Sequence, residues 1–381
     1  MVIILLPDET FTYQFQRRIS MKKNSINITK TYLPKLEEYI EYLQKIWENH
    51  QLTNNGPLVL ELEAKLKAFL GVKNLILVSN GTLGLQIAIR ASELQNEIIT
   101  TPFSYVATTS SIVWEGVKPV FVDIDPNTLC IDPDLIEAAI TPNTTAILTT
   151  HVYGIPCDVI KINEIAKKHQ IKVIYDAAHS FGVKYYGKSL AAYGDISILS
   201  FHATKLFHTA EGGAIITNDD QLAHKIKYMR NFGHKGQEDF WGLGINGKVS
   251  ELHAAMGLCV LPQINEIINI RKQVFECYDE LIINLNLRKP SLPDNTEHNF
   301  IYYPVIFPSE SSLLRVKTAL NKQAIYPRRY FYPALTKLPY IQTQTARLSE
   351  VISKKVLCLP IDTYISQKFA LKLFDIIKNN M

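Results

Sequence analysis

Short runs of consecutive apolar residues alternate with amphipathic segments through the middle of the chain. The runs are NLILVS, EIITT, KPVFVDI, AILTTHV, KVIYD, ISILSF and AIIT, at residues 74–79, 97–101, 118–124, 146–152, 172–176, 196–201 and 214–217. Because their apolar residues are consecutive rather than alternating, we interpret the runs as strands buried on both faces. Amphipathic segments between them, such as 82–94 and 159–170, are typical of crossover helices. The pattern predicts a large α/β domain over residues 55–260, with a doubly wound and mostly parallel sheet.

The pattern changes after Pro262. A long helical stretch covers about 263–285, and a proline-containing turn, a strand-like IYYPVIF segment and a final helix near 366–379 follow it. This order of elements predicts a smaller α+β domain over residues 261–381.

The N-terminal part is less regular. Residues 1–20 have no clear periodicity, so we expect an N-terminal extension there, followed by an N-terminal segment over 21–54 that contains a helix near 33–48. The apolar run at the start ends at Pro7, which is too short for a signal peptide or a membrane span. We therefore expect a cytoplasmic protein without a membrane partner.

Composition excludes several classes of protein. Hydrophobic residues make up 47% and charged residues 20% of the 381 residues, as in globular chains. The net charge of +4 is too small for a nucleic-acid binder. Five widely spaced cysteines form no CxxC pair, so we expect reduced thiols and no metal site.

Three strand ends carry candidate chemistry, since functional groups of open α/β sheets gather at the carboxyl ends of strands. The turn at 79–84, SNGTLG, can offer backbone N–H groups to a phosphate, or Thr82 can simply cap a helix. Asp176 ends KVIYD and can reach a ligand or cap a helix. Lys205, in SFHATK before EGG, is a candidate Schiff-base amine, because a desolvated lysine loses its charge more readily; a solvated surface lysine is the alternative.

Together these groups meet the needs of pyridoxal 5′-phosphate (PLP). A lysine can bond to its aldehyde, a carboxylate can keep its pyridine nitrogen protonated, and an anion-binding turn can hold its phosphate. Phe103 or Tyr105, which follow the run EIITT, could stack on the cofactor ring or belong to ordinary packing.

The SFHATK and EGG blocks resemble the DegT/DnrJ/EryC1/StrS family of nucleotide-sugar aminotransferases, and the likeness runs from LTNNGP at 52–57 to LCLP at 357–360. The resemblance implies a PLP-dependent transferase of fold type I. It implies catalysis by Lys205 and cofactor binding by Gly81, Thr82, Tyr105, Asp176, His179, Ser200, Lys205 and Asn246. Gly81, Thr82 and Ser200 would hold the phosphate, and His179 would lie near the phenolic oxygen.

The same resemblance implies a homodimer with shared active sites. Asn246 lies in GINGK, which resembles a segment whose Asn reaches the cofactor phosphate of the neighbouring subunit. Lys248 replaces the usual Arg of that segment. Its role stays open, because the ammonium of Lys is a point charge and cannot form the two parallel hydrogen bonds that a guanidinium forms.

The reaction implied is amino transfer from L-glutamate to a nucleotide-linked keto sugar, because Lys205 stands where the related dehydratases have His. The GINGK, DAAHS and FHATKLFHTAEGG blocks favour C4 of dTDP-4-dehydro-6-deoxy-D-glucose, giving dTDP-4-amino-4,6-dideoxy-D-glucose for O-antigen or other glycan biosynthesis. Amination at C3 of a dTDP-3-keto-6-deoxyhexose is the first alternative. A non-catalytic regulator with a PLP fold is the second.

Six further residues are candidates for substrate binding. They are His202, His208, Lys248, Arg328, Arg329 and Tyr330. Guanidinium groups suit a diphosphate or the carboxylates of glutamate. A structural imidazole, a solvated arginine and ordinary packing are the competing interpretations for His, Arg and Tyr respectively.

Overall fold

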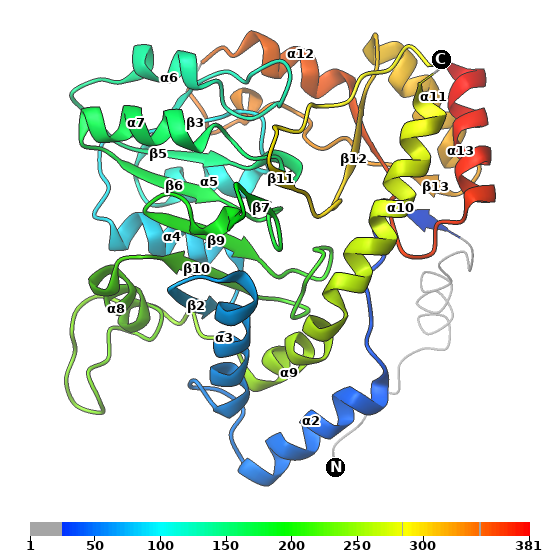
Figure 1. Ribbon diagram of the computed structural model, residues 1–381. Helices are drawn as coiled ribbons and strands as arrows, with labels where there is room; N and C mark the ends of the chain where they lie inside the picture. The colour runs from blue at the N-terminus through cyan, green and yellow to red at the C-terminus, as the bar shows by residue number, and fades with distance from the viewer. Residues whose placement is uncertain (1–24, 284, 343) are drawn as a thin grey trace, which may run out of the picture.

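A computed structural model describes residues 25–283, 285–342 and 344–381 (Figure 1). The seven predicted strands form one sheet in the order β2-β10-β9-β6-β5-β3-β4. Their bounds are β2 (Asn74–Val78), β3 (Glu97–Thr100), β4 (Lys118–Phe121), β5 (Thr144–Thr150), β6 (Lys172–Asp176), β9 (Ile196–Ser200) and β10 (Gly213–Thr217). Within this sheet only β10 is antiparallel to its neighbours, β2 and β9. The predicted α/β fold with a mostly parallel sheet is confirmed.

Helices cover both faces of this sheet, so each strand is apolar on both sides. One face packs against α3 (Pro57–Leu70), α6 (Pro133–Ala139), α7 (Val159–His169) and α9 (Glu251–Val260), and the other against α4 (Gly81–Ala91), α5 (Val106–Trp114) and α8 (Asp220–Met229). In β2, Leu75 and Leu77 belong to the first core, whereas Ile76 and Val78 belong to the second. This alternation explains the consecutive apolar residues of the sequence.

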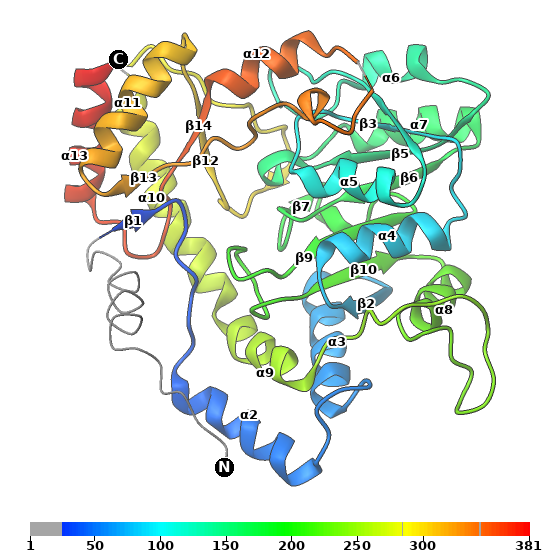
Figure 2. The ribbon, with the colours of Figure 1, turned by 180° about the vertical axis from the view of Figure 1, so that it is seen from behind.

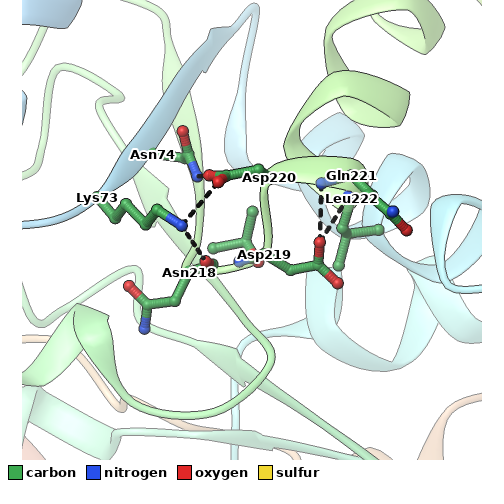
Figure 3. Close-up of polar contacts among 8 residues, drawn as sticks. Lys73, Asn74, Asn218, Asp219, Asp220, Gln221 and Leu222 are labelled. Atoms are coloured by element: carbon green, nitrogen blue, oxygen red, sulfur yellow. Dashed lines mark hydrogen bonds and ion pairs between the residues drawn. The ribbon is translucent and has the colours of Figure 1, made fainter.

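Helix α8 begins at a polar cluster that fastens it to the start of β2 (Figure 3). The Asp219 side chain accepts hydrogen bonds from the first turn, including the backbone N–H of Gln221 at 2.8 Å. The next carboxylate, Asp220, accepts from Lys73 Nζ at 2.8 Å and from Asn74 Nδ2 at 2.9 Å. Side-chain caps of this kind fix where a helix starts.

The C-terminal part builds its own small core. Its elements are α10 (Ile264–Ile282), β12 (Tyr303–Ile306), α11 (Glu310–Lys322), α12 (Arg347–Lys355), β14 (Val356–Leu359) and α13 (Gln367–Asn380). Strands β12 and β14 pair antiparallel, and α10, α11 and α13 pack around them. Figures 1 and 2 show α10 running from the sheet-bearing part to this group of elements.

Short elements complete the described chain. They are β1 (Ile26–Asn27) paired with β13 (Ile325–Tyr326), a small sheet of β7 (Lys184–Tyr185), β8 (Lys188–Ser189) and β11 (Thr296–Glu297), and the 3₁₀ turns η1 (Val152–Gly154), η2 (Leu190–Ala192), η3 (Leu261–Gln263) and η4 (Leu335–Lys337). No helix in the described ranges has the length and apolar character needed to cross a membrane.

The N-terminal segment packs with the large unit. Helix α2 (Leu36–Asn49) lies against α9, where the Tyr39 hydroxyl donates to the Leu252 carbonyl at 3.1 Å. The core on the α3 face also includes Ile28 from the N-terminal segment and Val356 from the C-terminal part. The division at residues 55 and 261 stays a prediction, because this core runs across both positions. The expected extension over 1–20 lies outside the described residues.

Candidate active site

A cavity of about 720 Å³ opens at the carboxyl ends of the parallel strands. Strands β5, β6 and β9 end at Thr150, Asp176 and Ser200, and all three residues line it. Ten of the residues singled out from the sequence line this cavity: Gly81, Thr82, Tyr105, Asp176, His179, Ser200, His202, Lys205, Arg328 and Tyr330. The rule that functional groups follow strand ends therefore locates most of the site.

The lysine and the carboxylate occupy this cavity together. Asp176 is 4% exposed; one carboxylate oxygen accepts from Thr108 Oγ1 at 2.6 Å and the other from the backbone N–H of Ala178 at 3.1 Å. Burial raises the pKa of Asp176, while these hydrogen bonds and the Lys205 charge act in the opposite direction. Desolvation lowers the pKa of Lys205 to about 8, against the attraction of Asp176. An amine with this pKa is a better nucleophile and base near neutral pH than an ordinary lysine.

The N-terminus of α4 forms an anion-binding cradle. Asn80 is the cap, because its side-chain Oδ1 accepts from the backbone N–H of Leu83 at 2.8 Å. Thr82 therefore lies in the first turn and is not the cap. The N–H groups of Gly81 and Thr82 have no acceptor within the helix. A Cβ at position 81 would lie 3.2 Å from Ser200 Cβ, so glycine lets this turn approach the end of β9 closely.

His179 is held as a neutral donor. Its Nδ1 accepts the backbone N–H of Tyr153 at 3.2 Å, which assigns the ring proton to Nε2. Burial and the nearby Lys205 charge keep the pKa of His179 well below its usual range. The imidazole lies parallel to the Phe331 ring, with the two centroids 5.8 Å apart. The histidine can therefore donate one hydrogen bond to a ligand in the cavity.

The structure separates the two aromatic candidates for ring stacking. Tyr105 lines the cavity and is 53% exposed, as expected of a side chain that a ligand could cover. Phe103 is fully buried and packs edge-on against Tyr153 and Phe331. Tyr105 is thus the one of the two placed to meet a cofactor ring.

The mouth of the cavity carries polar and cationic groups. His202 Nδ1 lies 2.8 Å from Thr204 Oγ1, and its Nε2 lies 3.6 Å from the Glu211 carboxylate. The Arg328 guanidinium lies over the Tyr330 ring, 4.9 Å from its centroid. Both side chains are exposed and line the cavity, so the Arg328 guanidinium and the His202 imidazole can meet an anionic substrate there.

Four predicted residues do not line this cavity. His208 is buried and its Nε2 donates to the Tyr32 carbonyl at 2.6 Å, so it ties the N-terminal segment to the loop after Lys205. Arg329 pairs with Glu310 at 2.7 Å, on the side of α11. Asn246 and Lys248 contact each other, Lys248 Nζ to Asn246 Oδ1 at 2.8 Å, and Asn246 is exposed.

Five further residues contribute to the site without a signal that was recognised in the sequence. Ser104, Thr108 and Thr150 are buried hydroxyls beside Asp176, and Tyr302 and Phe331 come from the C-terminal part. The strand-end rule could have indicated Ser104 and Thr150, since they follow or end predicted strands. No comparable rule exists for the two aromatics.

The site fits PLP. One cavity brings together a lysine of lowered pKa, a buried carboxylate and a helix N-terminus built for a phosphate, the three groups that this cofactor needs. A mostly parallel seven-stranded sheet with these groups at its carboxyl edge defines a PLP-dependent transferase of fold type I.

Comparison with known proteins agrees. Residues 35–377 match the DegT/DnrJ/EryC1/StrS aminotransferase family, and the chain belongs to this family of PLP-dependent sugar aminotransferases. It is 44% identical to the dTDP-4-amino-4,6-dideoxy-D-glucose transaminase of Shigella dysenteriae, over 90% of this chain and 95% of that protein. The Escherichia coli transaminase of the same name is 38% identical, over 95% of this chain and 100% of that protein. The solved structure of DesI with its TDP-sugar product superposes with a TM-score of 0.88 at 30% identity, covering 93% of this chain and 92% of DesI. The predicted family, enzyme class and cofactor are confirmed.

Proposed function

We propose that this enzyme transfers the amino group of L-glutamate to C4 of dTDP-4-dehydro-6-deoxy-D-glucose, giving dTDP-4-amino-4,6-dideoxy-D-glucose. The observation that carries the proposal is the 44% identity to a transaminase named for this product, across 95% of that protein. An amino sugar linked to dTDP is an activated donor, so the product suits the assembly of O-antigen or another glycan.

Lys205 acts as the acid and base of the reaction. Bound in the cavity, PLP supplies an aldehyde that holds amines covalently and a ring that withdraws electrons from the reacting carbon. Because the pKa of Lys205 is about 8, its Nζ can take a proton from Cα of glutamate and later give one to C4 of the sugar. A lysine with an ordinary pKa would be protonated almost completely at neutral pH and would be a poor base.

The surrounding residues hold and orient the cofactor. With PLP bound, the Asp176 carboxylate would hold the proton on the pyridine nitrogen, and His179 Nε2 would donate to the phenolic oxygen. The N–H groups of Gly81 and Thr82, with the Ser200 hydroxyl, would bind the phosphate, as expected where a helix begins. Fixing these groups before the reaction lowers the entropic cost of reaching the reactive geometry.

The Arg328 guanidinium and the His202 imidazole at the mouth of the cavity bind the anionic parts of the substrates. Arg328 is supported by the Tyr330 ring and can form a bidentate pair with a carboxylate or phosphate. His202 lines the same cavity and adds a further donor. We assign Arg328 and His202 to substrate binding, and we do not extend this assignment to His208 and Arg329, whose partners lie elsewhere.

The active unit is a homodimer in this proposal. Asn246 does not line the cavity of its own chain, and the loop that carries it exposes large apolar side chains. Phe240 is 57% exposed, Trp241 51% and Leu243 73%. A patch of this kind is typical of an interface. Docking the loop on a second copy would bring Asn246 to the partner's cofactor phosphate, with Lys248 orienting the amide.

A half-reaction tests the catalytic assignment. Purified protein loaded with PLP should lose the visible absorbance of the bound aldehyde when L-glutamate is added, and one 2-oxoglutarate should form per site. The Lys205→Ala variant should bind PLP without the covalent bond and show no such conversion. A wild-type spectrum that glutamate leaves unchanged would instead support the regulator alternative.

A further inference from the structure

Three buried hydroxyl groups beside Asp176 form a hydrogen-bonded row in the order Thr150, Ser104, Thr108, and the two ends of this row, Thr150 Oγ1 and Thr108 Oγ1, also lie 3.4 Å apart. The Ser104 hydroxyl is 2.7 Å from Thr108 Oγ1 and 2.8 Å from Thr150 Oγ1, and Thr108 Oγ1 is 2.6 Å from a carboxylate oxygen of Asp176. Ser104, Thr108 and Thr150 are each 2% exposed or less. They come from the loop after β3, from α5 and from the end of β5, so the fold brings the row together from three separate elements.

The proton count gives this row a direction. Each hydroxyl has one proton, and an ionised carboxylate can only accept. The Thr108 proton must therefore point to Asp176, so the 2.7 Å contact between Ser104 and Thr108 uses the Ser104 proton. The contact between Thr150 and Ser104 then uses the Thr150 proton. All three protons point toward the carboxylate, and bonds aligned in this way strengthen one another.

The row opposes the effect of burial on Asp176. Burial alone favours the neutral acid, which would not hold a proton on a pyridine nitrogen. The charged side chain that lowers the pKa of Asp176 is Lys205, whose amine would be taken up by the cofactor when PLP binds. In the loaded enzyme the hydrogen bonds from Thr108 and from the backbone N–H of Ala178 therefore still favour the ionised form, and Thr108 is the larger of these two influences and the one that a side-chain substitution can remove.

We propose that Thr108, supported by Ser104 and Thr150, is a positioning residue that keeps Asp176 ionised and aimed at the pyridine nitrogen of PLP. This inference rests on the proposed function, because it assigns Asp176 the same partner. It adds a specific role for Thr108, which acts on the cofactor only through Asp176.

The test measures cofactor affinity in the apoenzyme, with a matched control on the same helix. Thr108→Val removes the hydroxyl and keeps the shape, whereas Thr108→Ser keeps the hydroxyl. Thr109→Val is the control, since the Thr109 hydroxyl is equally buried and has no hydrogen-bond partner among the described residues. Each protein is titrated with PLP and with the carbocyclic analogue in which carbon replaces the pyridine nitrogen.

Thr108→Val should raise the dissociation constant for PLP on the order of tenfold, because a hydrogen bond to a charged group is lost. Thr108→Ser and Thr109→Val should stay within about twofold of wild type. Ser104→Ala should raise the constant by about two- to threefold, since the second bond acts only by polarising the first. For the carbocyclic analogue, Thr108→Val and wild type should agree, because Asp176 has no ring nitrogen to hold.

Two outcomes would overturn the inference. The first is an unchanged affinity of Thr108→Val for PLP. The second is an equal loss of affinity for PLP and for the analogue, because such a loss would come from a change in the fold and not from Asp176. Failure of wild type to bind PLP would contradict the proposed function instead, so the two failures can be told apart.

Discussion

At the scale of single residues, the pKa of Lys205 decides when the enzyme can react with its cofactor. Desolvation lowers this pKa to about 8, so the neutral, nucleophilic amine predominates above that pH. The rate of covalent PLP capture by the apoenzyme should rise about tenfold per pH unit below 8 and level off above it. Borohydride trapping followed by mass spectrometry measures the rate, and a plateau only near pH 10 would contradict the assignment.

The same measurement on Asp176→Asn tests the charge coupling. The Asp176 carboxylate raises the pKa of Lys205, so its removal should move the plateau to lower pH. Lys205→Ala is the control and should show no trapped adduct. A plateau that moves to higher pH would mean that the two groups do not interact as the cavity geometry indicates.

At the scale of elements, the close approach of β10 to the start of α4 shapes the phosphate cradle. A Cβ on Gly213 would lie 2.8 Å from the backbone atoms Asn80 C, Gly81 N and Leu199 O, which cannot move independently of the fold. Gly213→Ala should therefore lower the free energy of unfolding by about 1–3 kcal/mol and weaken PLP binding.

Denaturant unfolding of the apoenzyme and PLP titration check this together. Gly242→Ala is the matched control, because the nearest heavy atom to a Cβ there is 3.6 Å away and the residue is exposed. Gly242→Ala should leave both the free energy of unfolding and the affinity for PLP nearly unchanged. If Gly213→Ala also left the free energy of unfolding and the affinity for PLP unchanged, the tight contact between β10 and the start of α4 would not be what positions the phosphate cradle.

The elements also show how far the sequence alone could lead. The seven strands follow from runs of apolar residues, since burial on both faces requires them. The antiparallel direction of β10 could not be predicted, because apolar pattern carries no strand direction. Asp176 and Lys205 follow from strand ends, whereas Tyr302 and Phe331 reach the cavity through packing of the C-terminal part. The side chains of His208 and Arg329 could bind an anionic substrate, but the structure pairs them with Tyr32 and Glu310 outside the cavity. The type of a residue does not reveal which partner it has in the fold.

At the scale of the whole molecule, the proposed dimer predicts that two defective subunits can repair one another. Lys205→Ala and Asn246→Ala carry their defects in different halves of a shared site. If Asn246 serves the partner's site, mixing the two variants under conditions of subunit exchange should restore up to about a quarter of wild-type activity, because one site in each mixed dimer is intact. If Asn246 served its own chain, the mixture should show no gain over the separate variants.

The position of the new amine in the product tests whether the enzyme aminates C4 of the sugar. The enzyme is incubated with PLP, ¹⁵N-labelled L-glutamate and dTDP-4-dehydro-6-deoxy-D-glucose, and the product is examined by NMR. We expect a ¹⁵N-bearing carbon at C4 of the sugar, with loss of the keto carbon signal and release of 2-oxoglutarate. An amine at C3, or no amino sugar from an enzyme that completes the half-reaction with glutamate, would contradict it.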